Sequence, residues 1–407
     1  MGRSTLAEFY PPFPNPFLLG LARTISSTYL SWRKQIKLDI SPEVLQQLQA
    51  LEGQRLLILP NHPTFDDPIV VFALTNRLKG AFYFLAAYEQ FAGLLGWFFQ
   101  RLGAYSIRRG IADRASIAQT LELLTQPNCR LVIFPEGGCS FQNDTVMPFR
   151  VGAIQMAFQA LNRLARQGEP VPDLYVVPLA VKYFYIGNMA PVIQRSLHHL
   201  ATELGLKQSG TEYDQLRAIS EQMLTNLEQE YHLRSPGREQ WCWNARINAL
   251  KLEVIQACEA SLGMTSVLNE PIRERVYRIQ YALKTQDDLE SVLEGQSTWN
   301  ADAIYRATIR LLNFDAIYDG YVADHPSPER FLDTLTRLER EVFHIDQPAP
   351  KGHRLAQVEA GAPINLRDYF PEYQKNRAVT INQLTLMAQQ AVQHGLDQLN
   401  AKLKQTD

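Results

Sequence analysis

The chain has few cysteines, no excess of charge and no long apolar run. Its four cysteines form no Cys-x-x-Cys pair, so neither a metal site nor a disulfide framework is expected and a reducing compartment is favoured. The net charge of −2 gives no basic field, which argues against a nucleic-acid partner. No stretch reaches the ~20 apolar residues of a spanning helix, and the start lacks the pattern of a secretion signal. Any membrane contact is therefore expected from one side.

Residues 14–37 carry apolar side chains at the spacing of an amphipathic helix, with basic residues at the flanks. The apolar positions are Leu18, Leu21, Ile25, Tyr29 and Trp32. A helix packed on the core explains this pattern equally well. The preceding segment 9–17 is apolar but too rich in proline to be helical, which favours a membrane interface. Residues 1–40 are therefore predicted to contact a membrane surface, together with Trp97, Phe98 and Phe99.

Short apolar runs alternate with helical patterns in residues 41–191. Strands are predicted at residues 55–60, 81–86, 104–107, 130–134 and 174–183. Helices are predicted at residues 42–53, 68–77, 91–102, 112–124 and 151–165. Strands that alternate with helices of this length are typical of an α/β fold, with a mostly parallel central sheet flanked by helices.

The pattern becomes helical in residues 192–347 and returns to the α/β type in residues 348–407. Long helices are predicted at residues 212–231, 238–262, 271–293, 301–322 and 329–343. A last strand is expected at 353–359 and a last helix at 378–403. The chain is thus predicted to be an α/β domain interrupted by an all-helical insertion.

The segment that directly follows the first apolar strand carries a histidine and an aspartate. His62 and Asp67 are separated by four residues across a turn that leads into a helix. An imidazole that donates one ring proton to a carboxylate is held in one tautomer, as a general base requires. A structural hydrogen bond explains the same pair. His62 is, however, the only histidine before residue 198, so it is the candidate for imidazole catalysis in this domain.

Two other strand ends carry groups that suit an anionic ligand, and a third segment has an unusual strand sequence. Arg109 follows the strand at 104–107, and Glu136 and Gly137 follow the strand at 130–134. A guanidinium binds phosphate through two parallel hydrogen bonds, and the backbone N–H groups of a Gly-Gly turn add donors. The segment 175–181 is a strand with an internal proline. A solvated arginine and an ordinary turn are the alternative interpretations of each segment by itself.

These segments, taken in order, resemble the four blocks of the glycerolipid acyltransferases, the lysophosphatidate and glycerol-3-phosphate acyltransferase superfamily. Asn61-His62 with Asp67-Pro68 is similar to the His-x-x-x-x-Asp block. The other blocks are matched by Gly103-Ala-Tyr-Ser-Ile-Arg-Arg109, Phe134-Pro-Glu-Gly137 and Val177-Pro-Leu179. The likeness covers about residues 50–185, and Val358-Glu-Ala-Gly-Ala-Pro-Ile-Asn-Leu366 resembles the strand that normally closes this fold.

The resemblance implies a fatty-acyl transfer, in phospholipid synthesis, from a thioester to a hydroxyl of lysophosphatidate or glycerol-3-phosphate. His62 would be the general base, Asp67 its orienting partner, and Arg109, Glu136 and Gly137 the residues that position the acceptor. The chain departs from the family where Gly138-Cys139 replaces the frequent Thr-Arg, which puts the acceptor in doubt; Arg150 is the candidate for the lost charge. No cofactor is implied, because acyl-CoA or acyl carrier protein (ACP) enters as co-substrate. The location implied is the cytoplasmic face of a membrane, as a peripheral protein.

Several alternatives remain open from the sequence. In the first alternative, the acceptor is a lysophospholipid or another alcohol. In the second, water replaces the alcohol, as in a thioesterase. Cys139 is an alternative nucleophile beside the site. A catalytically silent lipid-binding scaffold is the alternative of another class.

Overall fold

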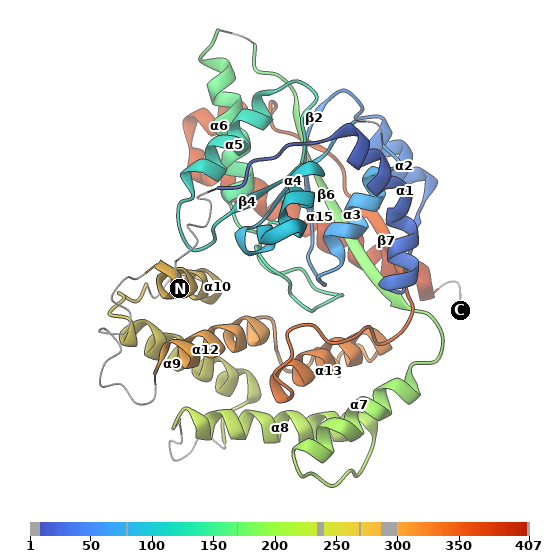
Figure 1. Cartoon of the computed structure of the whole chain (residues 1–407), viewed down its shortest axis with the longest axis vertical. Coiled ribbons are helices and arrows are strands. Elements are labelled where there is room, and N and C mark those ends of the chain that lie inside the picture. Colours follow the sequence, from blue (N-terminus) through green and yellow to red (C-terminus); the bar gives the residue numbers. More distant parts are fainter. Residues whose placement is uncertain are drawn as a thin grey trace. The chain divides into compact units, whose positions relative to one another are not determined.

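The computed structural model describes residues 9–78, 80–168, 170–233, 240–267, 270–285 and 299–404 (Figure 1). By their internal contacts the residues form two units. The first comprises Met1–Arg108, Ala112–Phe184 and His353–Asp407, and the second comprises Arg109–Ile111 and Tyr185–Gly352. The first unit is thus divided in sequence by the second, with borders a few residues outside the predicted 192 and 347.

The first unit is built on a sheet in the order β1-β7-β6-β2-β5-β3-β4, with β8 antiparallel to β6. Its strands are β1 Ile36–Ile40, β2 Arg55–Pro60, β3 Tyr83–Ala87, β4 Ala104–Ile107, β5 Arg130–Val132, β6 Leu174–Tyr185, β7 Arg354–Ala360 and β8 Ile364–Asn365. β2 lies parallel to both β5 and β6. The predicted α/β fold with a mostly parallel sheet is confirmed.

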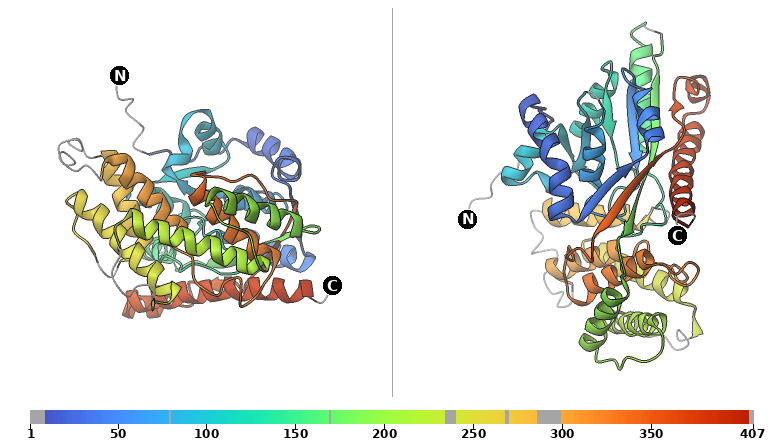
Figure 2. Two further views of the ribbon diagram at one scale, coloured as in Figure 1. Left: turned by 90° about the horizontal axis from the view of Figure 1, so that it is seen from below. Right: turned by 90° about the vertical axis from the view of Figure 1, so that its right-hand side faces the viewer.

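Both faces of the sheet are covered by helices (Figure 2). Alternate residues of β2 point to opposite faces, so its whole apolar run is buried. Leu56 and Ile58 join the core under α1 Pro16–Arg33, α2 Pro42–Gln49 and α3 Asp67–Thr75. Leu57 and Leu59 join the core under α5 Arg114–Thr125, α6 Gly152–Ala165 and α15 Arg377–Lys404. This burial on two sides explains why the strand reads as an uninterrupted apolar run.

Three further helical segments lie in the described part of the first unit. These are the 3₁₀ helix η1 Tyr88–Phe91 and the helices α4 Gly93–Arg101 and α14 Phe370–Lys375. Within the described part of the chain, no helix has the length and apolarity needed to cross a membrane.

The second unit is helical and has a core of its own. Its helices are α7 Ala190–Glu203, α8 Glu212–Glu230, α9 Trp243–Ser261, α10 Ile272–Thr285, α12 Ala301–Phe314 and α13 Pro328–Val342. α7 was missing from the sequence-based assignment, and the helix expected to run to residue 322 ends at Phe314. The predicted helical residues 238–239 and 286–293 lie outside the described residues.

The N-terminal helix is shorter than its sequence pattern indicates. α1 ends at Arg33, where the predicted helix continues to residue 37. The positive φ of Gln35 (54°) turns the chain into β1, which pairs with β7 in parallel. The pairing partner lies more than three hundred residues away in the sequence, so the pairing that stabilises this strand cannot be recognised from its neighbours in the chain.

Candidate active site

The site is formed where two neighbouring parallel strands end. β2 leads into the loop that carries His62, and β5 leads into the loop that carries Glu136 and Ser140. The backbone N–H of His62 donates to Glu136 Oε1 (2.9 Å), and the N–H of Ser140 donates to the carbonyl of His62 (2.8 Å). Both backbone polar groups of His62, its N–H and its carbonyl, are therefore held by the loop that follows β5. The ring of Phe134 packs against the imidazole, with 4.6 Å between centroids.

His62 and Asp67 form the side-chain contact on which a general base depends. His62 Nδ1 lies 2.8 Å from Asp67 Oδ2. The imidazole retains 15% exposure, while the carboxylate is fully buried. An ionised carboxylate only accepts hydrogen bonds, so in the neutral imidazole the proton lies on Nδ1 and Nε2 carries the lone pair. The partly exposed ring thus has the tautomer that accepts a proton at Nε2.

Asp67 accepts further hydrogen bonds that fix its orientation. Oδ1 receives the hydroxyls of Thr64 (2.7 Å) and Tyr183 (2.6 Å), and Oδ2 receives the Thr64 N–H (2.8 Å). A buried carboxylate is costly unless its oxygens are hydrogen-bonded, and here both are. Burial raises the pKa of Tyr183 well above its usual value, and the Asp67 charge raises it further. Tyr183 therefore stays a hydroxyl donor at any physiological pH.

A second carboxylate, Asp66, binds two cations beside this pair. Arg354 Nη2 donates to Asp66 Oδ2 (2.8 Å), and Lys34 Nζ lies 3.0 Å from Asp66 Oδ1. The Arg354 guanidinium also lies over the ring of Tyr183, 5.1 Å from its centroid. Arg354 begins the strand that follows the helical unit, so the returning chain supports the tyrosine that contacts Asp67.

Gly137 and Arg150 lie side by side on the segment that follows β5. The N–H of Arg150 donates to the carbonyl of Pro135 (2.9 Å). Gly137 has φ +73°, and a Cβ placed there would come within 2.3 Å of the Arg150 guanidinium carbon. The position therefore requires glycine both for its backbone conformation and for the close approach of the arginine. Gly137, Arg150 and Glu136 thus belong to the segment that holds His62.

Arg109 is grouped with the helical unit by its contacts. Its guanidinium donates to the hydroxyl of Tyr277 (2.9 Å) and lies over that ring, 4.2 Å from the centroid. The adjacent Gly110, with φ +84°, leaves no room for a Cβ beside the backbone of Tyr277. The role in acceptor binding that the sequence indicates for Arg109 stays a prediction.

A comparison with known protein families finds a match for the segment that forms this site. The model of the family described as Acyltransferase matches residues 40–182. This part of the chain is an acyltransferase-family domain. The match ends one residue before Tyr183 and includes His62, Asp67, Glu136, Gly137 and Arg150. It supports an acyltransferase role for the protein. No curated protein matches the chain significantly.

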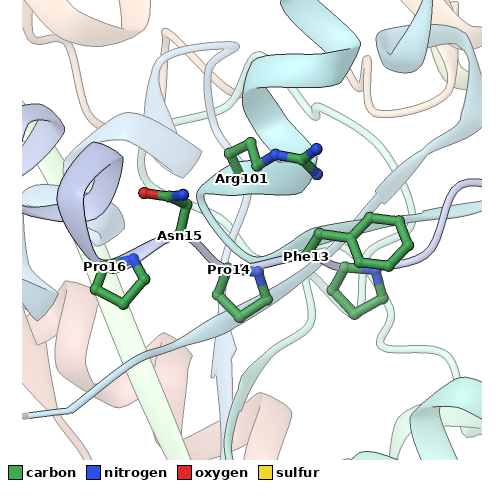
Figure 3. A pocket seen from close by; sticks show the side chains of 6 residues that line it. Phe13, Pro14, Asn15, Pro16 and Arg101 are labelled. Carbon is green, nitrogen blue, oxygen red and sulfur yellow. The ribbon is translucent and has the colours of Figure 1, made fainter.

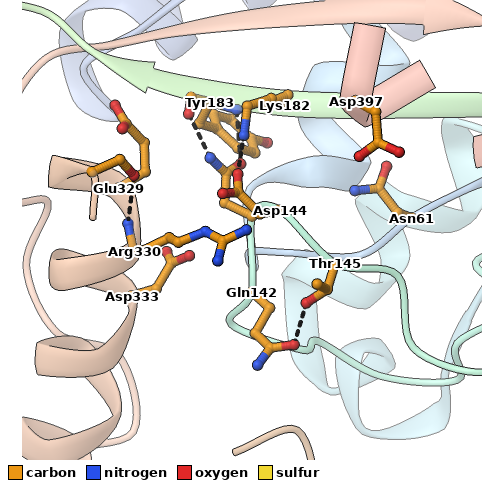
Figure 4. A network of polar contacts seen from close by, with 12 residues as sticks. Asn61, Gln142, Asp144, Thr145, Lys182, Tyr183, Glu329, Arg330, Asp333 and Asp397 are labelled. Atoms are coloured by element: carbon orange, nitrogen blue, oxygen red, sulfur yellow. Dashed lines mark hydrogen bonds and ion pairs between the residues drawn. The ribbon is translucent and has the colours of Figure 1, made fainter. Parts of the chain in front are cut away.

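The acyltransferase domain also anchors the loop that leaves the site after Ser140. The Asn143 side chain exchanges two hydrogen bonds with the backbone of Tyr183, at 2.6 and 2.8 Å. Asp144 forms a buried ion pair with Lys182 (Figure 4). Because successive side chains of a strand point to opposite faces, Lys182 belongs to the other face of β6 from Tyr183. Gln393 of α15 accepts the N–H of Val146 (3.0 Å). The loop is therefore fixed between β6 and α15.

The sequence did not indicate Thr64, Tyr183 or Arg354 as parts of the site. Thr64 lies inside the His-x-x-x-x-Asp spacing, where a hydroxyl near an aspartate is a recognisable turn signal. Tyr183 lies at the end of a strand that was predicted, but its partner strand was unknown. Asn61 was noted only as part of a motif; its side chain bridges to the backbone of Val181 at 2.7 and 3.0 Å and joins the end of β2 to β6.

Proposed function

We propose that the protein transfers a fatty acyl group from acyl-CoA or acyl-ACP to a hydroxyl of lysophosphatidate or glycerol-3-phosphate, in phospholipid synthesis. The observation that carries this proposal is the 2.8 Å contact between His62 and the buried Asp67 inside the acyltransferase domain. His62 Nε2 takes the proton of the acceptor hydroxyl as its oxygen attacks the thioester carbonyl. The C–S bond breaks as the ester forms, and the thiolate leaves with the proton from the imidazolium.

The roles of the neighbouring residues follow from this chemistry. Asp67 stabilises the imidazolium that forms during transfer. Gly137 and Arg150 supply a turn and a cation for the acceptor phosphate, and Glu136 holds the backbone of His62. Arg109 is a second candidate for binding the acceptor phosphate. The acyl transfer is expected to need neither a metal nor a cofactor, because the base and the thioester suffice.

An exposed apolar surface supports contact with a bilayer. Five side chains of α1 recur at helical spacing and are 43 to 84% exposed: Phe17, Leu21, Ile25, Tyr29 and Trp32. On α4, Leu94, Leu95 and Trp97 are 49 to 88% exposed. Exposed apolar side chains in this number favour membranes or partner proteins. The patch differs in detail from the predicted one, because Leu18, Phe98 and Phe99 are partly buried.

We assign this surface to the cytoplasmic face of a membrane, where the protein binds peripherally. The opposite side of α1 packs on the domain through Leu19, Ala22 and Leu30. The exposed apolar side chains and the buried side of α1 are thus distinct, which supports membrane contact over a helix that only packs on the core. A donor or acceptor with an acyl chain is most concentrated at such a surface.

The experiment that tests the proposal crosses donors with acceptors. Purified full-length protein is assayed with acyl-CoA and acyl-ACP against glycerol-3-phosphate, lysophosphatidate and lysophosphatidylcholine, with and without vesicles. His62→Ala is expected to lower the rate by roughly 10³-fold, the contribution of a positioned base. His394→Ala is the matched control, because His394 is exposed on α15 and bonds only locally to Gln398.

Each other outcome selects one alternative. Transfer to lysophosphatidylcholine alone would identify a lysophospholipid acyltransferase, and thioester loss without an acceptor would identify a thioesterase. Full turnover by folded His62→Ala would refute the proposal that His62 is the general base. It would favour the alternative in which Cys139 is the nucleophile. Lipid binding by the wild type without any turnover would favour the catalytically silent lipid-binding scaffold.

A further inference from the structure

The guanidinium of Arg101, at the end of α4, lies close to two exposed aromatic rings. Its guanidinium carbon is 5.5 Å from the centroid of Phe13 and 5.1 Å from that of Trp97. The two side chains are 53% and 49% exposed. Leu94, Trp97 and Arg101 are spaced by three and four residues, so they lie on one face of α4. The cation is thus placed on the apolar surface of the domain.

The segment before α1 forms the other wall of a shallow recess around Arg101. The N–H of Phe13 donates to the carbonyl of Gln100, and the N–H of Asn15 to that of Arg101, both at 2.9 Å. The Gln100 side chain donates to the carbonyl of Pro11 (2.8 Å). The recess has a volume of about 550 Å³ and is lined by Pro12, Phe13, Pro14, Asn15, Pro16 and Arg101 (Figure 3). Because proline fixes φ, this wall is formed before any ligand arrives.

The chemistry of the recess suits an anion, such as a phosphate, that can present two oxygens to one guanidinium. Among the residues that the structure describes, no carboxylate lies within ion-pair distance of the Arg101 guanidinium. Stacking on rings uses the face of a guanidinium and leaves its in-plane N–H groups to donate. Phosphate oxygens accept two such N–H groups at once. The Asn15 side-chain oxygen is occupied as the cap of α1, since it accepts the N–H of Leu18.

The surroundings of Arg101 decide which phosphate is bound. Phe17, in the first turn of α1, and Leu94 and Leu95 are all more than half exposed. A free phosphate gains nothing from an apolar rim, whereas a phospholipid presents its phosphate next to the boundary of the acyl chains, where an inserted apolar side chain and a nearby guanidinium meet both. We propose that the recess binds the head-group phosphate of an anionic phospholipid in the bilayer. This inference rests on the membrane contact proposed above and names the lipid that this contact recognises.

Vesicle co-sedimentation of the full-length protein tests the proposal. The vesicles contain phosphatidylcholine, with or without phosphatidylglycerol. Arg101→Lys keeps the charge but removes the planar fork, so it separates a built site from general attraction. Arg33→Lys and Arg33→Gln are matched controls, because Arg33 is an exposed arginine in the last turn of α1. Circular dichroism checks that each variant is folded.

We expect Arg101→Lys and Arg101→Gln to weaken binding to phosphatidylglycerol vesicles by roughly fivefold or more, as loss of a charge-assisted hydrogen bond does. Arg33→Lys should bind as the wild type does, and Arg33→Gln should lose up to about fivefold, the effect of one charge near an anionic surface.

Three results would overturn the head-group site. Equal binding by Arg101→Lys and the wild type would show that charge alone acts, and would leave the membrane contact standing. Displacement by inorganic phosphate, against chloride at the same ionic strength, would identify a site for free anions. Absence of wild-type binding to either vesicle would remove both the site and the membrane contact, while the transfer assay would still decide the catalytic proposal.

Discussion

Tyr183 donates its hydroxyl to Asp67 at 2.6 Å, from a strand that ends beside the loop of the histidine. The tyrosine is buried, and Arg354 lies against its ring. Asp67 is therefore oriented from two directions, by Thr64 of its own loop and by β6 of the sheet. A carboxylate fixed in this way holds the imidazole at Nδ1 without having to reorganise during proton transfer.

Removal of this hydroxyl is expected to affect turnover more than stability. Tyr183→Phe keeps the ring that packs under Arg354 and deletes one hydrogen bond to Asp67, so kcat should fall roughly tenfold. The Michaelis constants should not change, because Tyr183 contacts the base's partner rather than a substrate. Tyr175→Phe is the control, since Tyr175 is a partly buried tyrosine on the same strand and face. A kcat equal to that of the wild type would make Tyr183 a packing residue only.

Exchange of Asp67 for its amide tests the tautomer of His62. An asparagine side chain at this position would present an NH₂ group or a neutral oxygen to Nδ1, and the NH₂ group draws the ring proton to Nε2. We expect Asp67→Asn to lower kcat by roughly 10³-fold or more, close to the effect of His62→Ala. The measurement is steady-state transfer at neutral pH, with the melting temperature recorded beside it. Activity within tenfold of the wild type would mean that Asp67 does not govern the base.

A methyl group at Gly137 should disturb the site through Arg150. Gly137→Ala places a Cβ 2.3 Å from the guanidinium carbon and strains a backbone with φ +73°. The left-handed conformation alone costs about 1–3 kcal/mol for a residue with a side chain. Gly152→Ala is the control, because its Cβ meets no atom within 4 Å. Urea unfolding and acceptor kinetics measure both effects; equal behaviour of the two variants would contradict the expectation.

The four cysteines should divide by burial in their reaction with thiol reagents. Burial raises the pKa of the Cys129 and Cys258 thiols to about 12, so neither forms the reactive thiolate at neutral pH. Cys242 is exposed and Cys139 partly so. A colorimetric disulfide reagent should therefore modify Cys242 and Cys139 in the native protein, and the others only after denaturation. Cys139→Ser should keep its transfer activity; its loss would favour the cysteine nucleophile.

Local patterns predicted most of the sheet and the loop of the base. The strands at 55–60 and 104–107 were predicted with the bounds that the structure has, because apolar runs between turn signals are a local property. β1 was missed because its Ile-Lys-Leu-Asp-Ile alternation directly follows an amphipathic helix and depends on pairing with β7. The helix expected up to residue 322 was too long, because apolar spacing continues beyond Phe314 into turns.

The sequence by itself determined most of the strands and helices of the α/β unit, the spacing of His62 and Asp67, and the exposed apolar side chains of α1. Each depends on residues a few positions apart, whose geometry the backbone fixes. The tertiary structure alone decided that Tyr183 meets Asp67 across 116 residues, and that Arg354 meets Asp66 across 288. The first contact arises because β6 lies next to β2 in the sheet. The second becomes possible because β7 returns beside β6, although the helical unit separates these two strands in the chain.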